Sequence, residues 1–446
     1  MAKLPNLLKL FNFFLPFIDP LYILQLEEYS TKRLIKWMRK FYWRRNIQVR
    51  EKLVFTARVK ITLLGSLVVW GLQFLITLYF LQASYLFGLV LIPFLFLSPY
   101  LIVLTCNYLI SLLEDIPKAK VRARASHKRL KNERMKVVVI AGSFGKTTTK
   151  NFLNELVRYS YRTQMIPGNI NTPGGIANWI LQELRPDTEL LLAEVDSYSR
   201  GEIAKSAHIL SADICILTTI GGQHEERFAS AEDLAAALLE VFTASPETAV
   251  KITTAEIRDT YRLNNITITT PLNAANTSLS ETNKHNLAFA LAACKELHID
   301  SHLIETTIPT LAPPERRQEV TTLFGYPGID DSYNISRQSA EAGILQARKL
   351  AQQHNKKLLV ITAGIPELAK EKAHHNKELG ELLSENADHT IILKSDFAET
   401  IVSGFSDMEK YTCIPSLSDF LYSETQKFKT EEWFLLFQPE LHDLYY

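Results

Sequence analysis

The chain has 446 residues, 47% of them hydrophobic, so it is long and apolar enough for two or three domains with sizeable cores. The net charge of +1 excludes a chain that is basic or acidic throughout, but residues 1–136 hold 22 Lys and Arg against 7 Asp and Glu. The four cysteines show no CxxC or Cys/His spacing, which excludes a zinc ribbon or a disulfide framework and favours a reduced, cytosol-facing protein.

Two apolar runs lie near the N-terminus. Ile61–Leu81 holds 21 uncharged residues and Leu86–Leu113 holds 28, and each exceeds the roughly 20 residues that cross about 30 Å of hydrocarbon. We predict transmembrane helices at about 61–81 and 86–113. Two buried helices of a soluble core are the alternative, although soluble helices of this length almost always show a polar face. The apolar start of the chain contains prolines and no clear cleavage site, so a cleavable signal peptide is not expected.

The charges that flank these runs predict their orientation. The connector QASY is short, whereas Lys32–Lys60 and Lys118–Lys136 are rich in Lys and Arg. By the positive-inside rule, both termini and the later domains lie on the cytoplasmic side of the cell membrane. We interpret the basic, aromatic-rich flanks as contacting anionic lipid rather than nucleic acid. Residues 1–135 are therefore expected to anchor the chain in the membrane.

A phosphate-binding loop follows in the segment VVVIAGSFGKTTTK, residues 137–150. A β-branched run precedes the glycines and apolar residues at helical spacing follow them, so the expected order is strand, turn and helix. In that setting the backbone around Gly142, Ser143 and Gly145 faces phosphate oxygens, and Lys146 reaches the β- and γ-phosphates. The hydroxyl of Thr147, beside Thr148, can hold Mg²⁺. Only two residues separate the glycines, fewer than in the usual loop.

The remaining residues predict two α/β domains. Glu194 ends a buried apolar strand downstream of the loop, where a second Mg²⁺ ligand is expected, whereas a lone histidine such as His224 is more often structural. Beyond a hinge at Pro313 and Pro314 the alternation restarts. It comprises a capped helix from Ser336, the strand KKLLVITAG, a helix over 370–384 and the strands HTIIL and WFLLF. We predict an ATP-binding domain over 136–312 and a Rossmann-like domain over 313–446.

Seven segments in this order resemble the Mur ligase family, and among its members the MurF-like type that adds D-alanyl-D-alanine. They are GSFGKTTTK, GNINTPGGIA, LLLAEVDSYSRGEI, LTTIGGQHEERFAS, HNLAFALAA, RQEV and DDSYNISRQS. The resemblance runs from about Val137 to the C-terminus. It implies an ATP-dependent amide ligase of peptidoglycan synthesis that uses ATP and Mg²⁺.

The resemblance also implies roles for individual residues. Lys146, Glu194 and His224 would be catalytic, and Thr147, Glu194 and His224 would bind metal, with Glu226 near the phosphates. Nucleotide contacts would come from the loop and from Asn286, Arg317 and Asp331. The substrate side would hold Asn169, Asn171, Tyr333 and Asn334.

The implied reaction forms an acyl phosphate on a muramyl-peptide carboxylate and joins it to an amino acid or a dipeptide such as D-alanyl-D-alanine. Soluble MurF-like ligases begin with a domain that grips the UDP part of the substrate, and here the membrane hairpin takes its place. We therefore hypothesise a lipid-linked acceptor, with a UDP-linked one as the alternative. The amine donor and the oligomeric state stay open.

Three departures from the family pattern keep other functions open. Leu238 occupies the position of a lysine that family members carbamylate to bind the second metal, and Phe289 replaces an asparagine expected near the adenine, so base recognition relies on stacking or is looser. The family segment Asn-Ala-Asn-Pro is replaced here by Asn-Ile-Ser-Arg, residues 334–337. The alternatives are a catalytically weak nucleotide-binding scaffold of wall synthesis, a ligase of another polymer such as polyglutamate, and an ATPase that powers transport. The last is disfavoured because neither apolar run holds an intramembrane charge.

Overall fold

The computed structural model describes residues 17–26, 29, 31–41, 53–132, 134–197, 199–221, 228, 230–269, 279–333, 335–365, 372–421 and 427–439. The chain divides into two compact units, one built on Met1–Lys120 and the other on Val121–His442. The predicted domain boundaries at 135/136 and 312/313 stay predictions.

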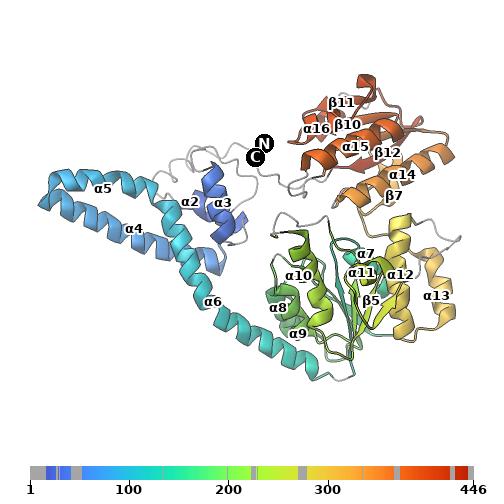
Figure 1. Cartoon of the computed structure of the whole chain (residues 1–446), viewed down its shortest axis with the longest axis horizontal. Coiled ribbons are helices and arrows are strands. Elements are labelled where there is room, and N and C mark those ends of the chain that lie inside the picture. Colours follow the sequence, from blue (N-terminus) through green and yellow to red (C-terminus); the bar gives the residue numbers. More distant parts are fainter. Residues whose placement is uncertain are drawn as a thin grey trace. The chain divides into compact units, whose positions relative to one another are not determined.

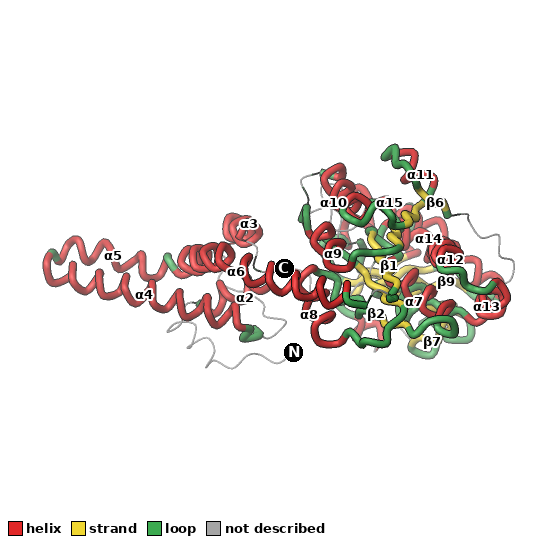
Figure 2. Tube along the Cα trace, turned by 90° about the horizontal axis from the view of Figure 1, so that it is seen from below, coloured by secondary structure: helices red, strands yellow, loops and turns green. Residues whose placement is uncertain are grey.

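The first unit is helical (Figure 1). Its helices are α2 (Ile18–Leu26), α3 (Thr31–Phe41), α4 (Ala57–Ala83), α5 (Tyr85–Leu97) and the start of α6 (Pro99–Leu130). The α4 and α5 helices lie side by side as a hairpin that turns at Ser84 (Figures 1 and 2). At the other end of α4, the buried side chain of Asn107 bonds to Arg58 Nη2 (2.8 Å) and to the carbonyl of Tyr29 (2.9 Å). These bonds tie the α2–α3 connection to α4 and α6.

The first predicted span is confirmed as a helix. The α4 helix is 27 residues long, begins with Thr56 capping the N–H of Val59, and leaves most of its large apolar side chains exposed within its unit. Among the described residues it is the one continuous helix that is long and apolar enough to cross a membrane. The number rises to two if the bent pair Tyr85–Leu95 and Pro99–Ser111 counts as one span.

The prediction of one continuous helix over 86–113 is wrong, because the run breaks at Ser98 and its two halves diverge by 68°. Pro99 has no N–H, so it leaves the carbonyl of Leu95 without its bond from residue i+4. The indole Nε1 of Trp70 on α4 donates to that carbonyl at 3.0 Å, and Ser98 Oγ donates to Gln73 Oε1 at 2.9 Å. The α4 helix thus supplies a donor to the carbonyl that the proline leaves free and makes a second hydrogen bond at the break.

The second unit begins inside α6. Ala125 is fully buried in the core of the following domain, and Ser126, Lys128 and Arg129 bond to backbone carbonyls at the C-terminal ends of two of its helices. The sequence-based prediction treated this segment only as a basic flank of the membrane region. Its side chains show that it is also part of the fold that follows.

The first sheet contains six strands in the order β2-β3-β1-β4-β5-β6, and every neighbouring pair is parallel. The strands are β1 (Lys136–Ala141), β2 (Thr163–Met165), β3 (Leu190–Glu194), β4 (Ile214–Leu217), β5 (Val250–Thr253) and β6 (Ile266–Ile268). The helices are α7 (Lys146–Val157), α8 (Pro173–Glu183), α9 (Glu202–Leu210), α10 (Ala231–Thr243), α11 (Ala255–Thr260), α12 (Glu281–Glu296), α13 (Ser301–Thr307) and the 3₁₀ turn η2 (Ile308–Thr310).

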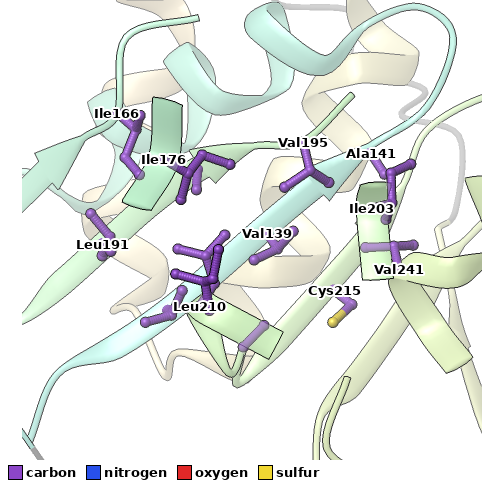
Figure 3. Close-up of a cluster of buried hydrophobic side chains, with 14 of the residues drawn as sticks. Val139, Ala141, Ile166, Ile176, Leu191, Val195, Ile203, Leu210, Cys215 and Val241 are labelled. Carbon is purple, nitrogen blue, oxygen red and sulfur yellow. The ribbon is translucent and has the colours of Figure 1, made fainter. Parts of the chain in front are cut away.

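Both faces of this sheet are buried, as expected for a parallel sheet. Val137, Val139 and Ala141 of β1 face a cluster completed by α8, α9 and α10 (Figure 3). Val138 and Ile140 face the opposite cluster, which α7 and α12 complete. The two-residue alternation of β1 thus supplies both cores and fixes the loop after Ala141 at the carboxyl edge of the sheet.

The second sheet has the order β11-β10-β9-β12-β8-β7, parallel except for the β7–β8 hairpin. Its strands are β7 (Glu319–Leu323), β8 (Tyr326–Asp330), β9 (Lys357–Thr362), β10 (His389–Leu393), β11 (Tyr411–Ile414) and β12 (Trp433–Gln438). Its helices are α14 (Arg337–Gln353), α15 (Lys372–Asn386), α16 (Ala398–Val402), η3 (Met408–Lys410) and α17 (Leu417–Asp419). The predicted cap at Ser336 is confirmed as a capping box with Ser339, whereas β7, β8 and β11 were not predicted. The two-sheet α/β fold class is confirmed.

Candidate active site

The loop after β1 has the backbone that a phosphate cradle needs. Gly142 and Gly145 adopt φ values of 137° and 82°, which L side chains rarely adopt. A Cβ at Gly142 would lie 2.1 Å from Thr218 Oγ1, and one at Gly145 would lie 2.2 Å from Asn286 Oδ1. Both positions therefore require glycine. The α7 helix starts directly after Gly145, so its N-terminal N–H groups point into the loop.

Hydrogen bonds and an ion pair to residues of the same domain hold the side chains of the loop. Ser143 Oγ accepts from the N–H of Gly221 at 3.0 Å, and Thr148 is buried. Lys146 Nζ donates to the Gly142 carbonyl at 2.6 Å and forms an ion pair with Asp196 Oδ2 at 3.2 Å. The loop lysine thus lies folded against its own loop, and a bound phosphate would have to compete with Asp196 for its ammonium group.

Glu194 lies at the end of β3, next to Thr147. Its carboxylate is 2% exposed and accepts from Thr147 Oγ1 through Oε2 at 2.9 Å. Its Oε1 lies 2.7 Å from Lys150 Nζ, which also donates to the Ile166 carbonyl at 2.7 Å. The structure therefore brings together Thr147 and Glu194, both predicted as metal ligands, and adds a buried lysine that was not predicted.

These donors fit a divalent cation. Glu194 Oε1 is buried, and its partner in the part of the chain that the structure describes is the Lys150 ammonium group at 2.7 Å. The carboxylate and the Thr147 hydroxyl are hard oxygen ligands, which suit Mg²⁺ or Mn²⁺. Gly168 lies against both groups, since its Cβ would be 3.2 Å from Glu194 Oε1 and 3.6 Å from Thr147 Oγ1. The predicted third ligand, His224, lies outside the described residues, as does Glu226.

Asn286 and Arg317 also reach the loop. The carbonyl of Asn286 accepts from Thr149 Oγ1 at 3.4 Å, and the Asn286 side chain lies directly above Gly145. Arg317 Nη2 donates to Thr147 Oγ1 at 3.1 Å, and its guanidinium stacks over the Tyr333 ring with 4.2 Å to the centroid. The ring is half exposed. Two predicted residues, Asn286 and Arg317, therefore contact the loop directly, and Tyr333 is connected to it through Arg317.

Asp331 lies apart from these contacts. It is 4% exposed, accepts from Gln438 Nε2 at 3.0 Å, and packs against Gly343 of α14. Burial raises the pKa of its carboxyl to about 7, and the hydrogen bond from Gln438 offsets part of that rise. The side chain is part of the C-terminal fold, and its predicted contact with ATP stays a prediction.

Of the other residues predicted on the substrate side, the structure describes Asn169 and Asn171 but not Asn334. Asn169 is exposed and Asn171 is half-buried in the segment before α8, where the Asn171 carbonyl accepts from the N–H of Asp196 at 3.1 Å. Asn334 lies outside the described residues. Because Asp196 also pairs with Lys146 of the loop, its hydrogen bond to Asn171 places this segment beside the phosphate loop.

The two substituted family positions are both core residues. Leu238 is 2% exposed in the cluster of α8, α9 and α10, and Phe289 is 3% exposed in the cluster that contains Phe152 of α7. The Phe289 ring is enclosed by apolar side chains, and the recognition of the base, by stacking or more loosely, stays a prediction. Leu238 likewise offers no polar atom to a metal.

Sequence reasoning missed Lys150 and Asp196. Lys150 stands four residues after Lys146, one turn along α7, and Asp196 stands two residues after Glu194. The spacing was visible in GKTTTK and AEVD, but only the fold shows that each lysine meets one of the two carboxylates. Elsewhere, His374, His375 and Glu378 of α15 could also group around a cation, but Arg337 already pairs with that carboxylate at 3.3 Å.

Residues 140–334 match the Mur ligase middle-domain family. The chain is 26% identical over 278 residues to the UDP-N-acetylmuramoyl-tripeptide–D-alanyl-D-alanine ligase of Bacillus subtilis (strain 168), covering 56% of this chain. The match spans 60% of that enzyme, less than two thirds of its length.

Solved structures share the fold. The MurF ligase of Thermotoga maritima in complex with ADP superposes with a TM-score of 0.63 at 21% identity, over 72% of this chain and 80% of that one. A folylpolyglutamate synthase/dihydrofolate synthase from Yersinia pestis, complexed with AMPPNP and a Mn ion, gives a TM-score of 0.50 at 13% identity, over 72% and 90%. At such identities the likeness extends to the fold alone.

Proposed function

We propose that this chain is a MurF-like member of the Mur ligase family, whose middle-domain model matches residues 140–334, and that it is an ATP-dependent amide ligase of peptidoglycan synthesis. One observation carries the proposal: a glycine-dependent phosphate loop ends at Thr147, which is hydrogen-bonded to the buried Glu194 and to Arg317. That arrangement suits phosphoryl transfer, which needs positioning and charge neutralisation more than covalent chemistry.

The proposed reaction has two steps. An oxygen of a muramyl-peptide carboxylate attacks the γ-phosphorus of ATP, and ADP leaves. The amine of an amino acid or a dipeptide such as D-alanyl-D-alanine then attacks the acyl carbon, loses a proton, and expels inorganic phosphate. A relative with 26% identity is named for this amine and a UDP-linked tripeptide, which supports the substrate class.

The chain's own residues would act by binding and orienting. The N–H groups after Gly142 and Gly145 would hold phosphate oxygens, and Lys146 would exchange Asp196 for the β- and γ-phosphates. Thr147 and Glu194 would hold a divalent cation, which when bound supplies charge neutralisation on the phosphates. Arg317 would contact the nucleotide from beyond the Pro313–Pro314 segment. The predicted part of His224 in metal binding and catalysis belongs to this proposal.

We further propose that α4, α5 and the start of α6 anchor the ligase in the cytoplasmic membrane, with both termini and the catalytic domains on the cytoplasmic side. The exposed apolar side chains of α4 and α5 support contact with lipid. The anchor would present the site to a lipid-linked muramyl peptide. Extension of lipid-linked and UDP-linked acceptors by the purified full chain tests this; equal rates, unchanged by deletion of the hairpin, would refute it.

Phosphate release from ATP tests the ligase activity. The detergent-solubilised chain is assayed with and without a muramyl-tripeptide acceptor and D-alanyl-D-alanine, beside Lys146→Ala. Release that needs both substrates and is lost in the variant supports the ligase.

The burial of Leu238 in an apolar cluster favours a second candidate, a catalytically weak nucleotide-binding scaffold of wall synthesis. ATP binding without substrate-dependent phosphate release would support it instead.

A further inference from the structure

Lys150 is a buried cation that the proposed reaction does not use. It is 3% exposed, and its ammonium group is fixed between Glu194 Oε1 and the Ile166 carbonyl, at 2.7 Å from each. A side chain enclosed in this way cannot move into solvent without opening the packing between α7 and the segment after β2. Its charge is therefore a permanent part of the site.

We propose that Lys150 is a built-in counter-ion of Glu194 that makes divalent-metal binding at this site depend on bound nucleotide. The inference rests on the proposed function, because it assumes that Thr147 and Glu194 receive the cation that accompanies ATP. It concerns the order of binding, which the ligase reaction leaves open.

The charges around the Thr147 hydroxyl support the inference. Glu194 contributes one negative charge, while Lys150 and Arg317 contribute two positive charges within direct contact of Glu194 or Thr147. Lys146 and Asp196 form a separate pair that is neutral overall. A divalent cation that enters alone meets a site whose only contacting carboxylate among the described residues is already neutralised. Its attraction to Glu194 is offset by repulsion from Lys150.

Nucleotide phosphates change that balance. The β- and γ-phosphates bring several negative charges to the loop, and they attract Lys146 and Arg317 as well as the cation. Glu194 Oε2 and the Thr147 hydroxyl can then serve as ligands while Lys150 stays on Oε1. Lys150 also keeps the buried carboxylate compensated in the absence of the cation, which an isolated buried charge would not be.

The experiment measures free Mn²⁺ by electron paramagnetic resonance as Mn²⁺ is titrated into the full chain in detergent, with and without ADP. We expect the wild-type chain to bind Mn²⁺ at least about tenfold more weakly without ADP than with it. Lys150→Met, which keeps the length of the side chain and removes its charge, should bind Mn²⁺ without ADP at least about tenfold more tightly than wild type. Lys150→Arg should behave as wild type. The exposed Lys295→Met is the matched control for loss of one positive charge.

The outcomes separate the two proposals. Wild-type chain that binds Mn²⁺ equally well without ADP overturns the inference and leaves the ligase intact, as does a folded Lys150→Met that gains no affinity. Wild-type chain that binds neither ADP nor Mn²⁺ with ADP overturns the proposed function itself. Thermal unfolding of each variant shows whether it is folded. If Lys150→Met is unfolded, Lys150→Gln replaces it, because glutamine also removes the charge and can still donate to the Ile166 carbonyl; the same gain in Mn²⁺ affinity without ADP is expected, and its absence overturns the inference.

Discussion

Replacement of Arg129 by methionine tests whether the end of α6 is an integral part of the nucleotide-binding domain. Arg129 is 7% exposed; its Nε donates to the Leu210 carbonyl at 2.6 Å and its Nη2 to the Ser211 carbonyl at 2.9 Å. Both acceptors lie at the C-terminal end of α9, where carbonyls lack partners within the helix. Burial lowers the pKa of Arg129, and the charge of Asp213 opposes that effect. The arginine is thus a buried, charged cap of another helix.

The expected loss follows from these contacts. A hydrogen bond from a charged donor contributes roughly 1.5–3 kcal/mol, and methionine keeps the apolar stem but leaves two carbonyls without a donor. Asp213 adds little to the loss, because its Oδ2 still accepts from the N–H of Val137 at 2.8 Å. We therefore expect Arg129→Met to lower the free energy of unfolding by about 2–4 kcal/mol, since water recovers part of the lost bonding.

Hydrogen exchange followed by mass spectrometry on the full chain in detergent measures this loss. For amides of β1 and α9 that exchange by domain opening, 2–4 kcal/mol corresponds to exchange about 30- to 900-fold faster. Lys131→Met is the matched control, since Lys131 is exposed two residues along the chain. Protection in β1 and α9 equal to that of wild type would refute the assignment of α6 to this domain.

Three further predictions concern single residues. Because burial raises the pKa of Asp331 to about 7 from a usual 3.8, its contribution to stability is complete below pH 4 and is lost as pH rises through 7. Denaturant titrations at pH 4 and pH 8 measure this loss. Between these pH values, the unfolding free energy of Asp331→Asn should fall by a few kcal/mol less than that of the wild-type chain. An equal fall in both chains would contradict the burial argument. Trp70→Phe leaves the Leu95 carbonyl without its donor and should destabilise the α4–α5 hairpin by roughly 1–3 kcal/mol, measured by denaturation in detergent against Trp433→Phe. Gly145→Ala meets Asn286 Oδ1 at 2.2 Å in a left-handed backbone and should weaken ADP binding at least about tenfold in equilibrium titration; wild-type affinity would show that the loop can change shape without cost.

The parts of the fold that depend on residues close together in the sequence were predictable. The β-branched run from Val137 to Ala141, the glycines of the loop and the cap at Ser336 each act within a few residues, so the pattern alone predicts strand, turn and helix. The break at Pro99 was also visible in principle, because proline removes a helical hydrogen bond. The apolarity of residues 86–113 was given more weight than that signal, and one transmembrane helix was predicted where two helices meet at an angle.

The contacts that complete the site depend on residues far apart in the chain. Lys150 meets Glu194, and Arg317 meets Thr147, only because β1 and β3 are neighbours and the chain returns after α13. The burial of Phe289 was not predictable from its motif either, since the same helix presents Asn286 to the loop and Phe289 to the core. Position along a motif specifies a residue's neighbourhood, whereas the direction of its side chain comes from packing.

The place of β1 within its sheet has a consequence for synthesis of the protein. Its two neighbours are β3 and β4, and the partner of Ala141 on β4 is Leu217, 76 residues downstream. Parallel strands cannot pair through a tight turn, so β1 has no partner until the ribosome has made β3, and one of its edges stays unpaired until β4 has also been made. During that interval a strongly apolar strand is exposed beside a nascent chain whose earlier segments are themselves apolar. We expect this window to be the stage at which the chain depends most on chaperones and is most prone to aggregation.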